Sequence, residues 1–145
     1  MTAVHAVLGF LTLAVTVAAA AWGSWGWWRV EPSELFWRLL RAAQALVVLE
    51  ALLGGVLYLL GERPGSNLHY VYGLTPIVVF FLAEQLRLSS ADAVLQARDL
   101  EDAAAMRALP EPTQRSIVLQ IVRREMGVMA LAAIVTVGLL ARAAF

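Results

Sequence analysis

Four long apolar stretches constrain the fold of this chain more than any other feature of its sequence. They cover residues 3–25, 36–60, 68–88 and 116–141. A helix needs about 20 mostly apolar residues to cross the hydrocarbon layer of a membrane, and each stretch reaches that length. Hydrophobic residues make up 61% of the 145 residues and charged residues only 15%, a balance typical of membrane proteins. The sequence therefore predicts an all-α, integral membrane four-helix transmembrane bundle that forms one domain over residues 1–145.

The positions of the basic residues predict how this bundle is oriented. All 11 basic residues are arginines, and after four crossings only Arg63 and Arg142 fall on the side that holds both termini. The other nine fall on the side of the first and third connections. Because cytoplasmic loops carry the excess of basic residues, we expect a multi-pass protein of the cell membrane with both termini outside. All five tryptophans lie between residues 22 and 37, as an aromatic belt on the cytoplasmic side.

The connections between the spans predict the remaining elements. The third connection contains SSADAVLQARDLEDAAAMRAL, which is rich in the helix formers Ala and Leu and is followed by Pro110 and Pro112. We expect one cytoplasmic helix there, over about residues 91–109, which the prolines end. The second connection, GERPGSN, is short and rich in turn residues. The second and third spans are therefore expected to be antiparallel neighbours.

The two histidines share one local pattern. Each begins an apolar stretch and stands four residues before a glycine, in the pairs His5–Gly9 and His69–Gly73. An offset of 64 residues aligns the two pairs, which indicates a weak repeat of two helical hairpins. Because the first and third spans run in the same direction, both histidines are expected at a similar depth on the outer side. Each glycine lies one turn below its histidine, where a flat group or another backbone can approach.

Two imidazoles that face each other over a glycine floor are typical of haem ligation. In its four-helix layout and its two His-x-x-x-Gly motifs, the chain resembles the small membrane b-type cytochromes, whose bundles hold haem between paired transmembrane histidines. The resemblance implies a haem b in electron transfer or haem handling, with His5 and His69 as axial ligands of the iron. It implies that Arg63 and Arg142 neutralise the propionates, and that three tyrosines line the haem edge: Tyr58, Tyr70 and Tyr72.

Other roles for the two histidines stay open at this point. Both are also consistent with wet interfacial positions that have no ligand function, with binding of another metal, or with pH sensing. If haem is bound, the electron would come from a quinone or from a partner redox protein.

A single acidic residue, Glu50, lies near the middle of the second span. An ionisable group at that depth costs at least about 2.5 kcal/mol and needs a proton or a partner. The partner is expected on another helix, and the polar candidates are Thr12, Thr16, Tyr72, Thr75 and Thr136. One interpretation is a proton or cation path centred on Glu50. The other is a protonated carboxyl that holds two helices in register.

An accessory or scaffold role is the alternative from a different functional class. In that role the arginines and tryptophans of the cytoplasmic side, together with the cytoplasmic helix, would bind lipid or a larger membrane complex. The small residues on several helix faces would also suit close contact in a homodimer.

Several chemistries are excluded by the composition. The chain has no cysteine, so disulfides and thiolate metal sites cannot form. The arginines follow the membrane surface rather than a soluble face, so no nucleic-acid partner is expected. No motif of a known catalytic site occurs, and we assign no catalytic residue.

Overall fold

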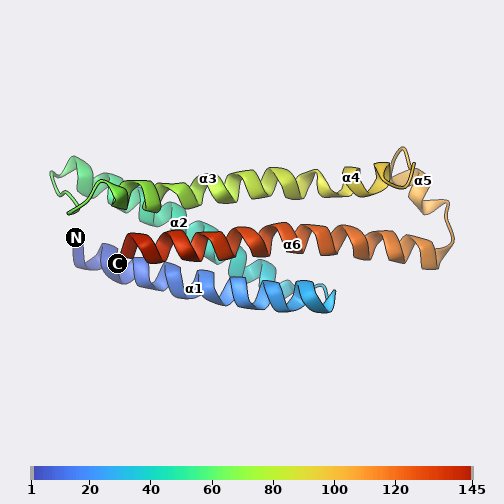
Figure 1. Cartoon of the computed structure of the whole chain (residues 1–145), viewed down its shortest axis with the longest axis horizontal. Coiled ribbons are helices and arrows are strands. Elements are labelled where there is room, and N and C mark those ends of the chain that lie inside the picture. The colour runs from blue at the N-terminus through green and yellow to red at the C-terminus, as the bar shows by residue number, and fades with distance from the viewer. Residues whose placement is uncertain (1, 145) are drawn as a thin grey trace.

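Four long helices form the structure, a computed structural model that describes residues 2–144. They are α1 (Thr2–Arg29), α2 (Glu34–Leu59), α3 (Leu68–Leu88) and α6 (Glu111–Ala144). All four are long and apolar enough to cross a membrane, and the described residues contain no strand. The predicted all-helical class and the four apolar helices are therefore confirmed. Both termini lie at one end of the bundle, together with the starts of α1 and α3, and we call it the histidine end (Figure 1).

The segment between the third and fourth long helices differs from the prediction. Instead of one helix over residues 91–109, it forms two short helices, α4 (Ser90–Gln96) and α5 (Ala103–Arg107). The helical conformation is interrupted between them at Asp99. This residue has a left-handed φ of 55°, a conformation that Asp tolerates better than most residues. The side chain of Asp102 then accepts a hydrogen bond of 2.8 Å from the backbone N–H of Ala105 and starts α5.

The last long helix begins earlier than the sequence indicated. It starts at Glu111 rather than near residue 116, so Pro112 lies in its first turn. A proline is tolerated there because the first backbone N–H groups of a helix have no helical partner. The first proline, Pro110, ends the preceding segment, whereas the second belongs to the start of α6. The beginning of α6 also packs against the segment that precedes it, through a small apolar cluster of Val94, Leu95 and Ile117.

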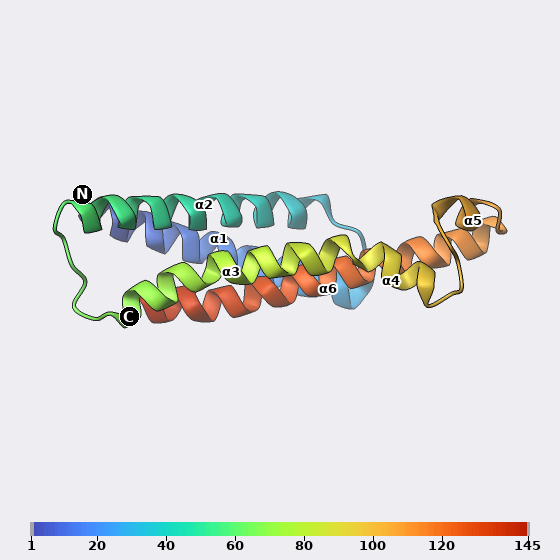
Figure 2. The same cartoon turned by 90° about the horizontal axis from the view of Figure 1, so that it is seen from above.

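The long helices pack in the order α2, α1, α6, α3. α1 contacts α2 and α6 extensively, α3 contacts mainly α6, and α2 makes few contacts with α3. α2 and α3 are antiparallel as expected, but they diverge toward the histidine end, where their connection spans the gap (Figure 2). The short connection therefore did not make them close neighbours along their whole length.

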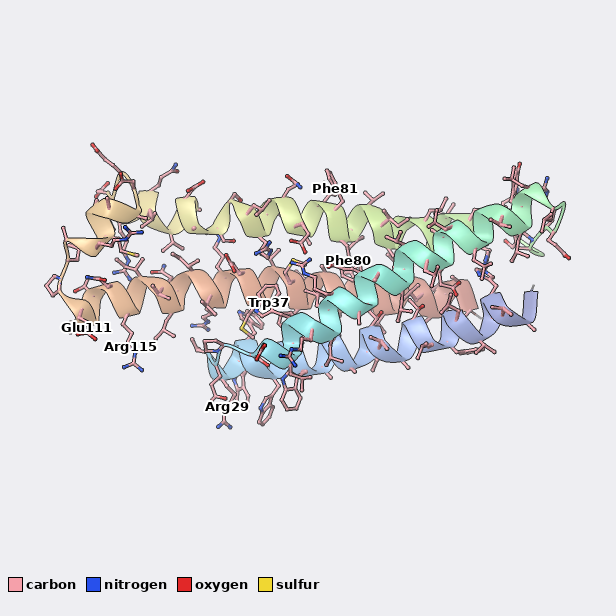
Figure 3. All side chains as sticks on the ribbon, turned by 180° about the vertical axis from the view of Figure 1, so that it is seen from behind. Arg29, Trp37, Phe80, Phe81, Glu111 and Arg115 are labelled. Carbon is pink, nitrogen blue, oxygen red and sulfur yellow. The ribbon has the colours of Figure 1, made fainter. Side chains whose placement is uncertain are left out.

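The buried core fills the half of the bundle away from the histidine end. It includes the first half of α2 and the second half of α3, with Phe36, Leu40, Phe80 and Met129 among its members. Phe80 points into the bundle and the adjacent Phe81 points away from it (Figure 3). Because this core ends before the histidine end, the divergence of α2 and α3 leaves space there.

A polar cluster holds α2 and α3 together on the side of the core. Glu84 of α3 accepts hydrogen bonds from Arg41 and from Gln44 of α2, the second at 2.9 Å. Arg87 donates a further bond of 2.8 Å to the same carboxylate. Hydrogen bonds thus hold α2 and α3 together at the Glu84 cluster, whereas the two helices lie apart at the histidine end.

Candidate functional site

A cavity of about 580 Å³ occupies the histidine end, between all four long helices. Most of its lining is apolar, and its polar side chains are His5, Glu50, Tyr58, Glu62, Arg63, His69 and Tyr70. Two glycines of the lining, Gly55 and Gly73, are open to it, since a Cβ built on either meets no atom within 4 Å. The volume lies within the range of small-molecule and cofactor pockets.

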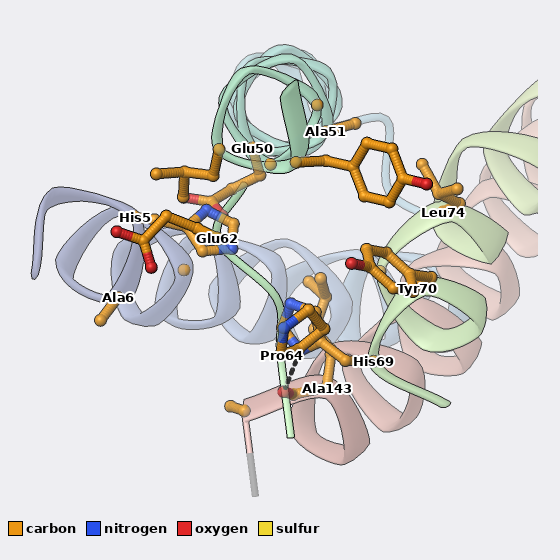
Figure 4. A pocket seen from close by; sticks show the side chains of 18 of the residues that line it. His5, Ala6, Glu50, Ala51, Glu62, Pro64, His69, Tyr70, Leu74 and Ala143 are labelled. Atoms are coloured by element: carbon orange, nitrogen blue, oxygen red, sulfur yellow. Dashed lines mark hydrogen bonds and ion pairs between the residues drawn. The ribbon is translucent and has the colours of Figure 1, made fainter. Parts of the chain in front are cut away.

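The structure brings the two histidines together at this cavity. Their ring centroids lie 5.9 Å apart, and the ring planes make an angle of 72°. His5 comes from the first turn of α1 and His69 from the first turn of α3, and both line the cavity wall (Figure 4). The pairing therefore depends on two parallel helices whose starts meet at one end of the bundle.

Glu50 has His5 as its partner, which the sequence did not indicate. The Nδ1 atom of His5 lies 2.7 Å from Oε2 of Glu50, and the two side chains are 23% and 12% exposed. None of the five polar candidates contacts this carboxylate. Three of them donate their hydroxyl hydrogen bonds to carbonyls of their own helices instead: Thr12, Thr16 and Thr75.

The glycines next to this pair explain how the two side chains meet. A Cβ built on Gly9 would lie 3.8 Å from Oε2 of Glu50, and one on Gly54 would lie 3.7 Å from Cε1 of His5. Both contacts follow the antiparallel register of α1 and α2. Since glycine presents no side chain, the carboxylate can extend over Gly9 toward the histidine one turn away. Gly9 thus faces Glu50, while Gly73 faces open space.

His69 has a different partner. Its Nδ1 atom lies 3.0 Å from the backbone carbonyl oxygen of Ala143, in the last turn of α6. The last carbonyls of a helix have no helical partner, and a carbonyl only accepts, so Nδ1 must carry the proton in this contact. In the neutral ring the lone pair then lies on Nε2, the atom that can bind a metal.

Three polar atoms of the cavity have no hydrogen-bond partner in the protein. Among the side chains of residues 3–144, only four buried atoms are in this state, and three of them line the cavity: His5 Nδ1, Glu50 Oε1 and Tyr70 Oη. The short contact between His5 and Glu50 therefore does not have hydrogen-bond geometry. Because buried polar groups are nearly always paired, this concentration indicates a place where a ligand can complete them.

The other residues expected at the site divide between two cavities. Arg63 and Tyr70 line the large cavity, as do Gly9 and Gly73. Arg63 donates a bond of 2.6 Å to the carbonyl of Tyr58, and its guanidinium lies 3.7 Å from the centroid of that ring.

Tyr72 and Arg142 lie outside the large cavity. They line a second one of about 340 Å³, of which His69 is also part. The guanidinium of Arg142 lies 5.8 Å from the ring centroid of Tyr72. His69 therefore stands between the two cavities, whereas His5 belongs only to the large one.

The donor set is too small for a bare metal ion. In the described part of the chain, no group of three or more His, Asp and Glu side chains is placed to hold one. A protein site for a bare ion such as zinc normally supplies three or four ligands.

Comparison with known proteins adds no relative. No protein-family model, no curated protein and no solved structure matches the chain. Its function is therefore inferred from the geometry of the site.

Proposed function

We propose that the chain is a small membrane protein that binds haem b between His5 and His69, for electron transfer or haem handling. The observation that supports this most strongly is the state of the two rings. The Nδ1 atom of each ring lies close to an oxygen, that of Glu50 at 2.7 Å and that of the Ala143 carbonyl at 3.0 Å, and the second contact is a hydrogen bond. Histidine ligands of metals nearly always have their second nitrogen held in this way.

The spacing of the two rings also supports the proposal. A bond of about 2.0–2.1 Å from a metal to an imidazole nitrogen puts the ring centroid roughly 3 Å from the metal, so two ligands on opposite sides have centroids roughly 6 Å apart. The observed separation is 5.9 Å. This separation supports a metal held between the two rings.

The surroundings of the histidines suit a flat, mainly apolar group with charged edges. Gly55 and Gly73 present no side chain to the cavity. Arg63 lines the cavity, and no carboxylate of residues 2–144 lies within ion-pair distance of it. Its guanidinium contacts Tyr58 through a hydrogen bond to the backbone carbonyl and through the ring face, and its charge could also pair with a propionate. Bound haem would supply a one-electron redox centre.

Glu50 would act on the site through His5. The carboxyl group of Glu50 lies next to Nδ1, so it can help to orient the ring and leave Nε2 for the iron. This contact also gives the buried acid a partner, which explains why an ionisable residue is retained at that depth.

The proposed setting is the cell membrane, with the histidine end outside. The support is the distribution of arginines, nine of which fall toward the end that carries α4 and α5. In that orientation the cavity opens near the outer surface, and α4 and α5 lie on the cytoplasmic side.

Titration of the detergent-purified protein with haemin tests the proposal. The wild-type protein is expected to take up one haem per chain, and His5→Ala and His69→Ala are each expected to weaken that uptake strongly. Asn67→Ala is the matched control, because Asn67 lies in the same turn as His69 but lines neither cavity. Uptake that is equal in all four proteins would contradict the proposal.

A further inference from the structure

The four long helices enclose the large cavity unevenly. α1 packs extensively against both α2 and α6, and α6 packs extensively against α3. α2 and α3 make few contacts, and they diverge at the histidine end, where the cavity lies (Figure 2). The side between α2 and α3 is therefore the least closely packed part of the cavity wall.

The outer surfaces of α2 and α3 are apolar at the level of the cavity. Leu52 and Leu59 of α2 and Val71 of α3 are more than half exposed, and both helices are apolar enough to cross a membrane. At the end of the bundle, by contrast, the connection between the two helices contributes the charged residues Glu62 and Arg63 to the cavity lining. In a membrane, the gap between α2 and α3 therefore faces the hydrocarbon layer, and the charged end faces the outer surface.

Two tyrosines meet across this gap. The ring centroids of Tyr58, near the end of α2, and Tyr70, in the first turn of α3, lie 5.8 Å apart, with the rings edge to face. Both line the cavity, and Tyr70 stands there beside Leu74 (Figure 4). Tyr58 is 48% exposed and is held by the guanidinium of Arg63, 3.7 Å from its ring centroid. The hydroxyl of Tyr70 has no partner in the protein, so a turn of this ring away from Tyr58 breaks no hydrogen bond.

From this arrangement we infer that the cavity exchanges its ligand with the membrane, through the gap between α2 and α3, and that Tyr58 and Tyr70 close this entrance. The ligand is thus an apolar or amphipathic molecule that dissolves in the bilayer. The inference rests on the proposed function for the identity of that ligand, but the route itself can be measured without haem.

A single introduced cysteine measures the route, because the chain has no cysteine of its own. Gly73 lines the cavity, and a Cβ built on it meets no atom within 4 Å, so Gly73→Cys adds a thiol without a clash. With the protein in phospholipid vesicles, the rate of its reaction with membrane-soluble N-phenylmaleimide is divided by the rate with a sulfonated maleimide that stays in water. This ratio removes the effect of burial on the reactivity of the thiol.

Gly65→Cys is the control for a thiol in water. Gly65 lies on the exposed outer connection and is also open at its Cβ position. Both positions lie at the histidine end, so the orientation of the protein in the vesicles affects them equally. The ratio is expected to be many-fold higher for Gly73→Cys than for Gly65→Cys. Gly55→Cys, at the other open glycine of the lining, repeats the measurement if Gly73→Cys does not fold.

Removal of one tyrosine ring tests the entrance. In the Gly73→Cys protein, Tyr58→Ala is expected to raise the rate with N-phenylmaleimide several-fold and to leave the rate with the sulfonated reagent unchanged. Leu59→Ala is the matched control, because Leu59 is the next residue of α2, is 84% exposed and does not line the cavity. It is expected to change neither rate.

The outcomes separate the route from the proposed function. Equal ratios for Gly73→Cys and Gly65→Cys would show that the cavity opens to the outer solution, which overturns the inference. A higher ratio for Gly73→Cys that Tyr58→Ala leaves unchanged would place the entrance elsewhere and would also overturn it. Haem uptake is decided separately by the haemin titration of the wild-type protein, so a failure of the route and a failure of the proposed function give different results.

Discussion

Nδ1 of His5 lies 2.7 Å from Oε2 of Glu50, so two residues 45 positions apart in the sequence form one unit at the cavity wall. Taken separately, each was open to interpretation: the histidine as a wet end residue, and the acid as the centre of a proton path. Their contact places the carboxyl group of Glu50 beside the ring, where we propose that it orients His5.

Replacing this carboxylate is therefore expected to weaken haem binding. Loss of a partner that holds a metal-ligating histidine typically costs about 10–100-fold in affinity, and we expect Glu50→Gln to fall in that range in a haemin titration. Glu34→Gln is a suitable control, because Glu34 pairs with Arg38 on the surface, far from the cavity. Equal haemin affinities of Glu50→Gln and the control would show that Glu50 has no role in orienting His5.

Tyr70 provides a second test of the cavity, because its hydroxyl has no partner in the protein. Removing an unpaired buried hydroxyl takes away a desolvation cost and no hydrogen bond, so Tyr70→Phe is expected to leave the thermal stability of the apo-protein unchanged or slightly higher. If a ligand completes this hydroxyl, the same variant binds haemin several-fold more weakly. Tyr72→Phe, outside the large cavity, should bind like the wild type. A lower Tm of apo Tyr70→Phe would contradict this account of Tyr70.

The close approach of α1 and α2 makes Gly23 sensitive to any side chain. A Cβ at this position would overlap with ring atoms of Phe36, which is fully buried. Overpacking of this kind costs about 1–3 kcal/mol, more than the roughly 1 kcal/mol by which Ala favours a helix over Gly. Gly23→Ala is therefore expected to lower the free energy of unfolding, measured by denaturant titration in detergent.

Gly138→Ala gives the opposite expectation in the same experiment. A Cβ there meets no atom within 4 Å, so only the helix preference acts, and the variant should be more stable by about 0.5–1 kcal/mol. Similar changes in both variants would mean that α1 and α2 do not approach as closely as described.

The Glu84 cluster is expected to stabilise the bundle more than an exposed ion pair does. Hydrogen bonds to charged groups contribute about 1.5–3 kcal/mol, so Glu84→Ala should lower the free energy of unfolding by about that amount. The exposed pair of Glu34 and Arg38 should contribute about 0–1 kcal/mol. If Glu84→Ala and Glu34→Ala have equal effects, the cluster does not fasten α2 to α3.

The sequence alone predicted the four long helices and the common level of the two histidines. Runs of apolar residues determine where such helices lie. Because the chain runs along the bundle once in each direction between the starts of α1 and α3, both starts lie at the same end. The contact of Glu50 with His5 was not predictable in this way. It depends on which faces of α1 and α2 meet, and that is set by close contacts such as that between Gly23 and Phe36.

The second connection and the segment after α3 show the same limit. The turn residues of GERPGSN indicated a short link, but the distance it spans depends on the packing of α3 against α6 rather than α2. Likewise, the helix-forming composition of residues 91–109 did not reveal the left-handed backbone at Asp99 that divides the segment. Local propensity is a weak guide where tertiary contacts decide.

The absorption spectrum of the purified protein loaded with haem, oxidised and then reduced with dithionite, tests the central claim most directly. If His5 and His69 both bind the iron, the oxidised protein shows the spectrum of a six-coordinate, low-spin haem, and reduction gives sharp α and β bands. A protein that stays colourless after incubation with haemin, or one whose spectrum is that of a five-coordinate haem, would contradict the claim that both histidines bind the iron.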